Sequence, residues 1–123
     1  MRVWLDDESW RDPPSGWTIV RTADEAIALL AAGGVDMISL DHDLGDFRYE
    51  PYPREITGMD VVRWMVANKV FPRVINVHSF NFARANVMVM DLLAAAPEEV
   101  SIRRWQFDKN VVKDLEELLS ENH

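Results

Sequence analysis

The sequence contains no cysteine among its 123 residues, which excludes disulfide-stapled scaffolds, thiolate zinc sites and cysteine nucleophiles. It also lacks an apolar run near the roughly 18 residues that a membrane-spanning helix needs, since the small-residue run Ala26 to Ala32 ends at Gly33-Gly34. The first residues carry no hydrophobic segment typical of a signal peptide. These absences predict a cytoplasmic protein without a membrane partner.

Basic residues are scarce, because 13 Lys and Arg stand against 21 Asp and Glu, for a net charge of −8. Such a chain is repelled by duplex DNA and by anionic lipid, so we expect neither as a partner. A phosphate-containing ligand would have to be held by a metal ion or by a local arginine cluster. No repeat or long linker divides the chain, which predicts a single domain over residues 1–123 and leaves the oligomeric state open.

Short apolar runs alternate with longer amphipathic segments along most of the sequence. The strands predicted from these runs are 3–5, 18–20, 36–40, 74–77 and 101–107. Four helices should follow Thr22, Thr57, Asn81 and Asp108, each of which is a good N-cap. The alternation predicts an α/β fold, a three-layer sandwich around a parallel sheet. Residues 8–16 and 45–55 are expected to be loops, so the first helix would be reduced or lost.

The third predicted helix carries an apolar stripe at helical spacing, which should face the core. Its members are Ala85, Met88, Val89, Leu92 and Leu93.

Polar side chains follow three of the predicted strands directly. They are Asp6 and Asp7, then Asp41, His42 and Asp43, then His78, Ser79 and Asn81. Ligands of open α/β sheets bind outside the carboxyl ends of the strands, so this edge is the candidate site. One such aspartate would ordinarily be a turn or cap residue, whereas several at one edge repel each other and need a cation or a raised pKa. Oxygen ligands suit Mg²⁺ or Mn²⁺, with Asp6, Asp7 and Asp41 as ligands and Asp43 as a further or outer ligand.

Two histidines adjoin these carboxylates, and a pair at one rim is typical of acid–base chemistry or of a metal site. Ser79 and Asn81 precede a helix whose N-terminal N–H groups favour an anion, so both are candidates for binding phosphate. Asn81 has the alternative role of a helix cap alone.

The acidic pair Asp6 and Asp7, the later Asp41 and the later Ser79 resemble the response-regulator receiver domain. The resemblance implies a receiver- or flavodoxin-like fold with a five-stranded parallel sheet in the order 2-1-3-4-5. It also implies Mg²⁺ on the carboxylates, a phosphoryl group accepted by Asp41, and Ser79 as its sensor. The usual lysine after the fifth strand is absent, and Arg103, Arg104 and Lys109 are candidate substitutes.

Longer strings resemble a divergent branch, the cyclic-phosphate processing receiver domains. They are Leu5-Asp6-Asp7-Glu8, Ser39-Leu40-Asp41-His42-Asp43-Leu44-Gly45, Thr57-Gly58-Met59-Asp60-Val61 and Val77-His78-Ser79-Phe80-Asn81. This resemblance implies a metal-dependent site acting on a cyclic phosphate of a nucleotide or an RNA end. The resulting hypothesis is phosphodiesterase-like hydrolysis, with Asp41, His42 and His78 catalytic and the histidines acting as base and acid. The alternatives are a signalling module phosphorylated at Asp41 and a non-catalytic receiver-like interaction domain.

Overall fold

A parallel sheet organises the protein, for which a computed structural model describes residues 1–7, 15–48, 54–105 and 109–121. Its strands are β1 (Arg2–Leu5), β2 (Thr18–Val20), β3 (Met37–Leu40), β6 (Val74–Val77) and β7 (Ser101–Arg103). They lie in the order β2-β1-β3-β6-β7, and every pair is parallel. The predicted order 2-1-3-4-5 is therefore confirmed, since β6 and β7 are the fourth and fifth strands of this sheet.

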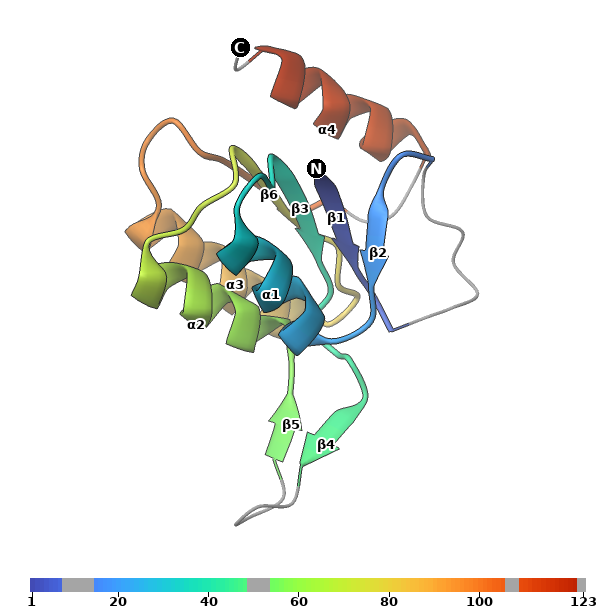
Figure 1. Ribbon diagram of the computed structural model, residues 1–123, viewed down its shortest axis with the longest axis vertical. Coiled ribbons are helices and arrows are strands. Elements are labelled where there is room, and N and C mark those ends of the chain that lie inside the picture. The colour runs from blue at the N-terminus through green and yellow to red at the C-terminus, as the bar shows by residue number, and fades with distance from the viewer. Residues whose placement is uncertain (8–14, 49–53, 106–108, 122–123) are drawn as a thin grey trace.

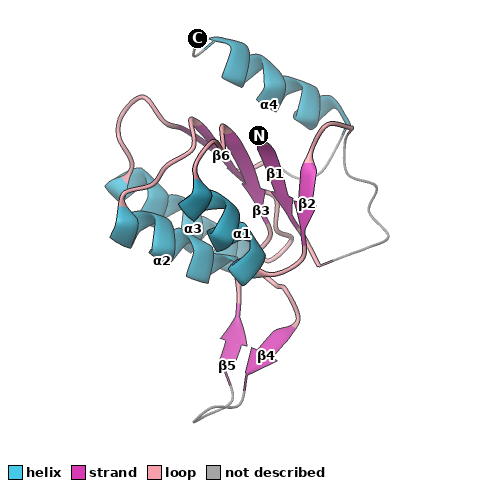
Figure 2. Cartoon of the chain, viewed as in Figure 1, coloured by secondary structure: helices cyan, strands magenta, loops and turns pink. Residues whose placement is uncertain are grey.

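Helices cover both faces of the sheet, as Figures 1 and 2 show. One face carries α1 (Ala23–Ala32), α2 (Gly58–Asn68) and α3 (Phe82–Ala95), and the other carries α4 (Lys109–Glu121). The predicted caps Thr22, Thr57 and Asn81 are confirmed, because each side chain accepts a backbone N–H of the first turn. Among the described residues, no helix has both the length and the apolar character to cross a membrane.

Two predictions lie outside the described residues: the Asp108 cap, and the reduced first helix as far as it would occupy residues 8–14.

The core lies on both sides of the sheet because side chains alternate along each strand. Val3, Leu5, Ile38, Leu40, Ile75 and Val77 face α1, α2 and α3. Trp4, Trp17, Met37 and Val74 face α4, where Leu115 and Leu119 cover them.

In α3 the buried residues are Ala85, Met88 and Leu92, whereas Leu93 is 62% exposed. The prediction for Leu93 is wrong, because Leu92 already occupies that turn of the buried stripe.

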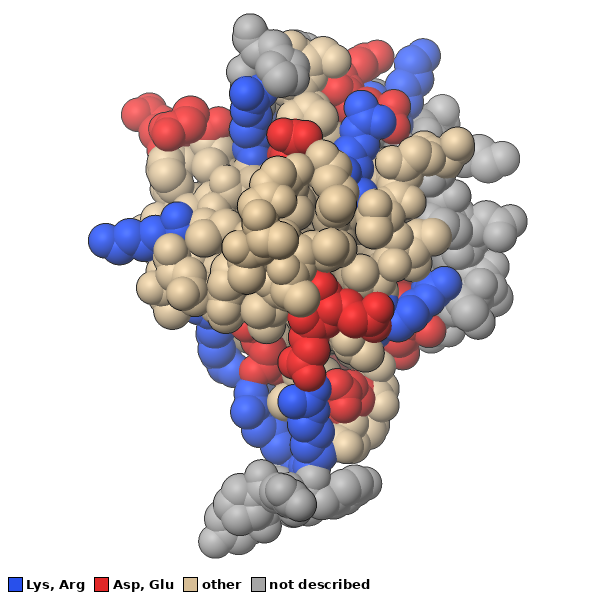
Figure 3. Space-filling model, viewed as in Figure 1, with Lys and Arg blue, Asp and Glu red and all other residues tan. Residues whose placement is uncertain are grey.

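A small hairpin interrupts the predicted loop 45–55, so that part of the prediction is wrong. Strands β4 (Asp46–Arg48) and β5 (Arg54–Ile56) pair antiparallel and project from the edge at which the parallel strands end (Figure 1). Arg48 binds Asp24 at 2.7 Å and Asp46 at 3.1 Å, and Arg54 pairs with Asp60. Figure 3 shows basic and acidic side chains interleaved above the hairpin tip. Ion pairs thus link the hairpin to α1 and α2, and Ile56 at the end of β5 packs into the core.

Candidate functional site

Three neighbouring strands end in register, and this brings three polar side chains together. Leu5, Leu40 and Val77 are paired across β1, β3 and β6. Asp6, Asp41 and His78 follow them, and the pairing continues as Asp41 N–H donates to Leu5 O (3.0 Å) and His78 N–H to Leu40 O (2.9 Å). One ligand atom from each of the three side chains lies within 4.8 Å of the other two, and all three residues are buried.

The carboxyl group of Asp41 is strongly perturbed within this buried cluster of Asp6, Asp41 and His78. Its side chain accepts the backbone N–H of His42 at 2.8 Å and a hydrogen bond from Ser79. Burial, followed by repulsion from Asp6, raises the pKa of Asp41 from 3.8 to about 7, against the lowering effect of those two hydrogen bonds. Asp7 raises the pKa further. A carboxyl group with this pKa changes its charge near neutral pH, and a nearby cation would strongly stabilise its ionised form.

The N-terminus of α2 fixes the backbone beside Asp41. Gly58 N–H donates to His42 O at 2.9 Å, and a Cβ on Gly58 would lie 1.9 Å from Asp41 O. No side chain fits at that distance, so the glycine is required for this close approach. Thr57 and Asp60 form a capping box around the same turn. The string Thr57-Gly58-Met59-Asp60 is therefore part of the site's scaffold.

His78 is completely buried and held from several sides. Its Nδ1 lies 2.7 Å from Ser39 Oγ, and its Nε2 lies 3.2 Å from Asp6 Oδ2. The indole of Trp4 stacks on the imidazole, with centroids 4.3 Å apart and planes 14° from parallel. Asn76 donates to Ser39 Oγ at 3.0 Å, so the ring is anchored to the interior of the sheet.

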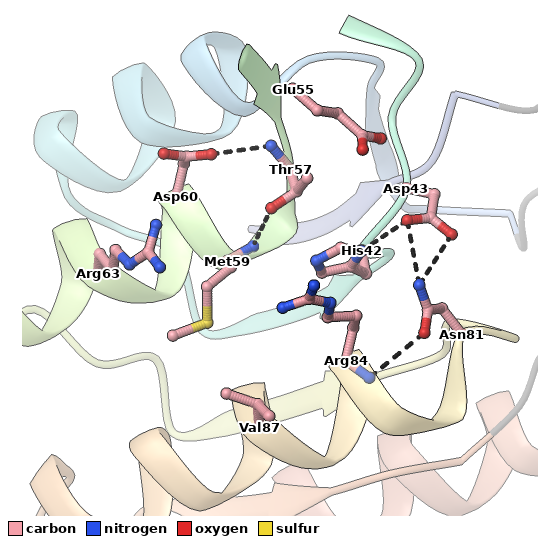
Figure 4. A pocket seen from close by; sticks show the side chains of 10 residues that line it. All are labelled: His42, Asp43, Glu55, Thr57, Met59, Asp60, Arg63, Asn81, Arg84 and Val87. Atoms are coloured by element: carbon pink, nitrogen blue, oxygen red, sulfur yellow. Dashed lines mark hydrogen bonds and ion pairs between the residues drawn. The ribbon is translucent and has the colours of Figure 1, made fainter. Parts of the chain in front are cut away.

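His42 faces a pocket instead. Figure 4 shows its imidazole between Asp43 and Arg84, and Asp43 Oδ1 lies 2.6 Å from His42 Nδ1. Asn81 Nδ2 reaches both oxygens of Asp43 at 3.4 Å. The pocket has a volume of about 420 Å³ and is lined by His42, Asp43, Glu55, Thr57, Met59, Asp60, Arg63, Asn81, Arg84 and Val87. Two arginines from α2 and α3 thus face the same hollow as the His42–Asp43 pair.

The predicted site residues therefore divide into two adjoining groups. Asp6, Asp41, His78 and Ser79 are buried, and none of these four lines the pocket. His42, Asp43 and Asn81 do line it.

The metal-binding roles predicted for Asp7 and Asp43 stay predictions. Both lie outside the group of Asp6, Asp41 and His78 that could share one ion among the described residues. Asp7 is half-buried, and Asp43 is engaged with His42 and Asn81.

The residues of the buried cluster fit a divalent cation. Two carboxylates and an imidazole nitrogen each place a ligand atom within 4.8 Å of the others, and the proximity of Asp6 makes ionised Asp41 unfavourable without positive charge. Among the candidate substitutes for the receiver lysine, Arg104 lies 4.9 Å over the ring of Phe82, and Arg103 lies 5.9 Å over the ring of Trp105.

Sequence reasoning assigned no role in the site to Ser39, Asn76, Arg63 or Arg84. Ser39 and Asn76 hold His78, and their signal was a polar residue in the middle of an apolar strand. Arg63 and Arg84 line the pocket, and for Arg84 the signal was a cation in the first turn of a helix, where the macrodipole disfavours it.

Comparison with known proteins agrees with this arrangement. The family model of the cyclic-phosphate processing receiver domain matches residues 1–94. Among solved structures, the signal receiver domain of a protein described as a Luxo repressor from Vibrio parahaemolyticus superposes with a TM-score of 0.63. The alignment covers 98% of this chain and 91% of that one at 18% identity, so it shows the shared fold alone. No curated protein matches. Since the family model spans β1 to α3 and includes every strand-end residue of the site, the chain belongs to the cyclic-phosphate processing receiver domain family.

Proposed function

We propose that this protein hydrolyses a cyclic phosphate on a nucleotide or an RNA end in a metal-dependent reaction. The observation that carries the proposal is the His42–Asp43 pair, which lines a pocket together with Arg63 and Arg84. The buried carboxylate cluster adjoins this pocket. The arginines supply positive charge beside the carboxylates Asp43, Glu55 and Asp60 of the same pocket, so the proposed phosphate would also need the cation of the buried cluster. Membership of the family supports a cyclic phosphate as the substrate.

His42 is the proton-transfer group of this proposal. Its contact with Asp43 assigns the proton to Nδ1 and leaves the Nε2 lone pair to accept another. A water oxygen forms a bond to phosphorus while its proton passes to Nε2. The P–O ester bond of the ring then breaks, and the leaving oxygen takes that proton. The product is an acyclic phosphate monoester, and His42 returns to its starting state.

Asp6 and Asp41 would hold the divalent cation, which supplies positive charge for the phosphoryl oxygens and lowers the pKa of bound water. Asn81, at the pocket end of α3, is the proposed contact for the remaining phosphate oxygens. Ser79 donates a hydrogen bond to Asp41, so we propose that it contacts the phosphate from the side of the buried cluster rather than from the pocket.

The test is a ³¹P NMR time course with a 2′,3′-cyclic and a 3′,5′-cyclic nucleotide. Reactions run with Mg²⁺ or Mn²⁺ and pass over a chelating resin before the spectrum, because Mn²⁺ broadens the resonances. We expect one cyclic resonance to disappear, and His42→Gln and Asp41→Asn to prevent its loss. Asp91→Asn, an exposed carboxylate change on α3, is the matched control. Persistence of both cyclic resonances with both metals refutes the proposal.

A second candidate is phosphorylation of Asp41, which its hydrogen bond from Ser79 favours, since the receiver resemblance makes these two residues acceptor and sensor. Incubation with acetyl phosphate followed by intact-mass measurement should then show a phospho-adduct that Asp41→Asn abolishes. A chain that binds no metal, hydrolyses neither nucleotide and forms no adduct would be the non-catalytic interaction domain.

A further inference from the structure

We propose that His78 is a metal ligand, so that the cation site is a two-aspartate, one-histidine site selective for Mn²⁺ and related first-row ions over Mg²⁺. The inference rests on the metal site of the proposed function and specifies its chemistry, but it does not depend on hydrolysis. It separates the two histidines by role, because His42 faces the pocket and His78 faces the carboxylates.

The positions of the ligand atoms support this assignment. His78 Nε2 lies 3.2 Å from Asp6 Oδ2, and Asp41 completes a group whose atoms lie within 4.8 Å of one another. Neighbouring ligand atoms of an octahedral ion with bonds of about 2.1 Å lie about 3.0 Å apart, and opposite ones about 4.2 Å apart. The Asp6–His78 distance is therefore that of two neighbouring ligands of one ion, and Asp41 offers a third ligand atom within 4.8 Å of theirs.

The surroundings of the imidazole fit a ligand better than a mobile proton carrier. Metal-bound histidines usually have a hydrogen-bond partner at the other ring nitrogen, and Ser39 Oγ occupies that place at 2.7 Å from Nδ1. Asn76 fixes Ser39 in turn, and its own amide is fixed because Asn76 Oδ1 accepts Trp105 N–H at 2.8 Å. Trp4 stacks on the ring and restricts its rotation. A buried ring so restrained keeps Nε2 aimed at the carboxylates.

The strand alternation places these groups in two parallel rows on the face that α4 covers. Trp4, Ser39 and Asn76 are register partners in one row, and Asp6, Asp41 and His78 form the next row at the sheet edge. The three residues of the inner row thus all support His78, Trp4 by stacking, Ser39 by a hydrogen bond and Asn76 through Ser39. An all-oxygen site would serve Mg²⁺, whereas an imidazole nitrogen favours Mn²⁺, Co²⁺, Ni²⁺ or Zn²⁺, since Mg²⁺ prefers oxygen ligands and loses its waters reluctantly.

The test measures metal binding without substrate. Calorimetric titration of the full chain with Mn²⁺ and with Mg²⁺ should give a dissociation constant at least tenfold lower for Mn²⁺. Pulsed EPR of the bound Mn²⁺ should show ¹⁴N coupling from one imidazole, and ¹⁵N-histidine labelling should replace it with a ¹⁵N signal. His42→Gln is the matched control and should keep the coupling, whereas His78→Gln should lose both the coupling and the preference for Mn²⁺.

Absence of histidine nitrogen coupling in the Mn²⁺-loaded native chain overturns the proposal, as does equal affinity for the two ions or a failure to bind Mn²⁺. The native chain and His42→Gln decide the matter even where His78→Gln does not fold. A chain that binds Mn²⁺ through His78 but leaves cyclic nucleotides intact would support this inference and refute the proposed hydrolysis.

Discussion

Replacing Asp41 by asparagine should stabilise the metal-free protein at neutral and alkaline pH. The pKa of Asp41 is about 7 in the folded protein against 3.8 as its ordinary value, because burial and Asp6 disfavour its charge. Below pH 4 the carboxyl is protonated in both states. Between pH 4 and 7 only the unfolded chain loses the proton, so the free energy of unfolding falls as pH rises through this window. A difference of about three pH units corresponds to a loss on the order of 4 kcal/mol above pH 7.

The assay is urea denaturation and thermal melting of both proteins in EDTA at pH 4, 6 and 8. Asp41→Asn should match the native chain near pH 4 and exceed it at pH 8, with a melting temperature higher by on the order of 10 °C. Asp91→Asn, an exposed change on α3, should show no such pH-dependent difference. Excess Mn²⁺ should reduce the difference in stability between Asp41→Asn and the native chain, because a cation that binds the folded native chain stabilises it by mass action. Equal stability of Asp41→Asn and the native chain at pH 8 in EDTA would refute the reasoning.

Other substitutions test the scaffold and the pocket. Gly58→Ala should lower the free energy of unfolding by roughly 2–4 kcal/mol in urea denaturation, because its Cβ would meet Asp41 O. Thr57→Ala should cost about 1 kcal/mol in the same assay by removing a helix cap, while Thr57→Ser should cost much less. Asn76→Ala should lower the free energy of unfolding by about 2–3 kcal/mol, since it leaves Trp105 N–H without its partner and removes the hydrogen bond that Asn76 donates to Ser39. If the proposed hydrolysis holds, Arg84→Gln should raise KM about tenfold in steady-state kinetics with little change in kcat, by removing a charge that binds phosphate.

The parallel sheet and its order could be predicted because several signals agree at each element. Thr18–Val20 and Val74–Val77 are apolar runs that end at polar residues, and the structure gives both strands these bounds. The hairpin could not be predicted in this way, because residues 46–48 and 54–56 contain mainly charged side chains and no apolar alternation. That residues 1–123 form one domain stays a prediction, supported by Leu115 and Leu119 packing against the sheet.

The sequence predicted which strand-end residues lie together, but not their division between the buried cluster and the pocket. The strand-end rule selected Asp6, Asp41 and His78 correctly as neighbours, because equal register makes successive residues of parallel strands adjacent. Which histidine faces the pocket depends on which face of the sheet leaves a pocket open, and the sequence does not show this. His78 lies on the α4 face with Asn76, two residues before it, whereas His42 follows Asp41 and so falls on the opposite face, where α2 and α3 line the pocket.

The same division bears on how an acidic protein could hold the proposed phosphate. The charge of −8 repels an anion at long range, and it gives long nucleic acids a penalty that grows with each phosphate. A small cyclic phosphate carries little charge, and the two arginines of the pocket together with a cation on the buried carboxylates would offset the repulsion locally. The ionised carboxylates that destabilise the metal-free fold at neutral pH are the same groups that would hold this cation. Asp41 would thus link folding stability to metal binding: Asp41→Asn should stabilise the metal-free fold and weaken the binding of the cation and of the proposed phosphate.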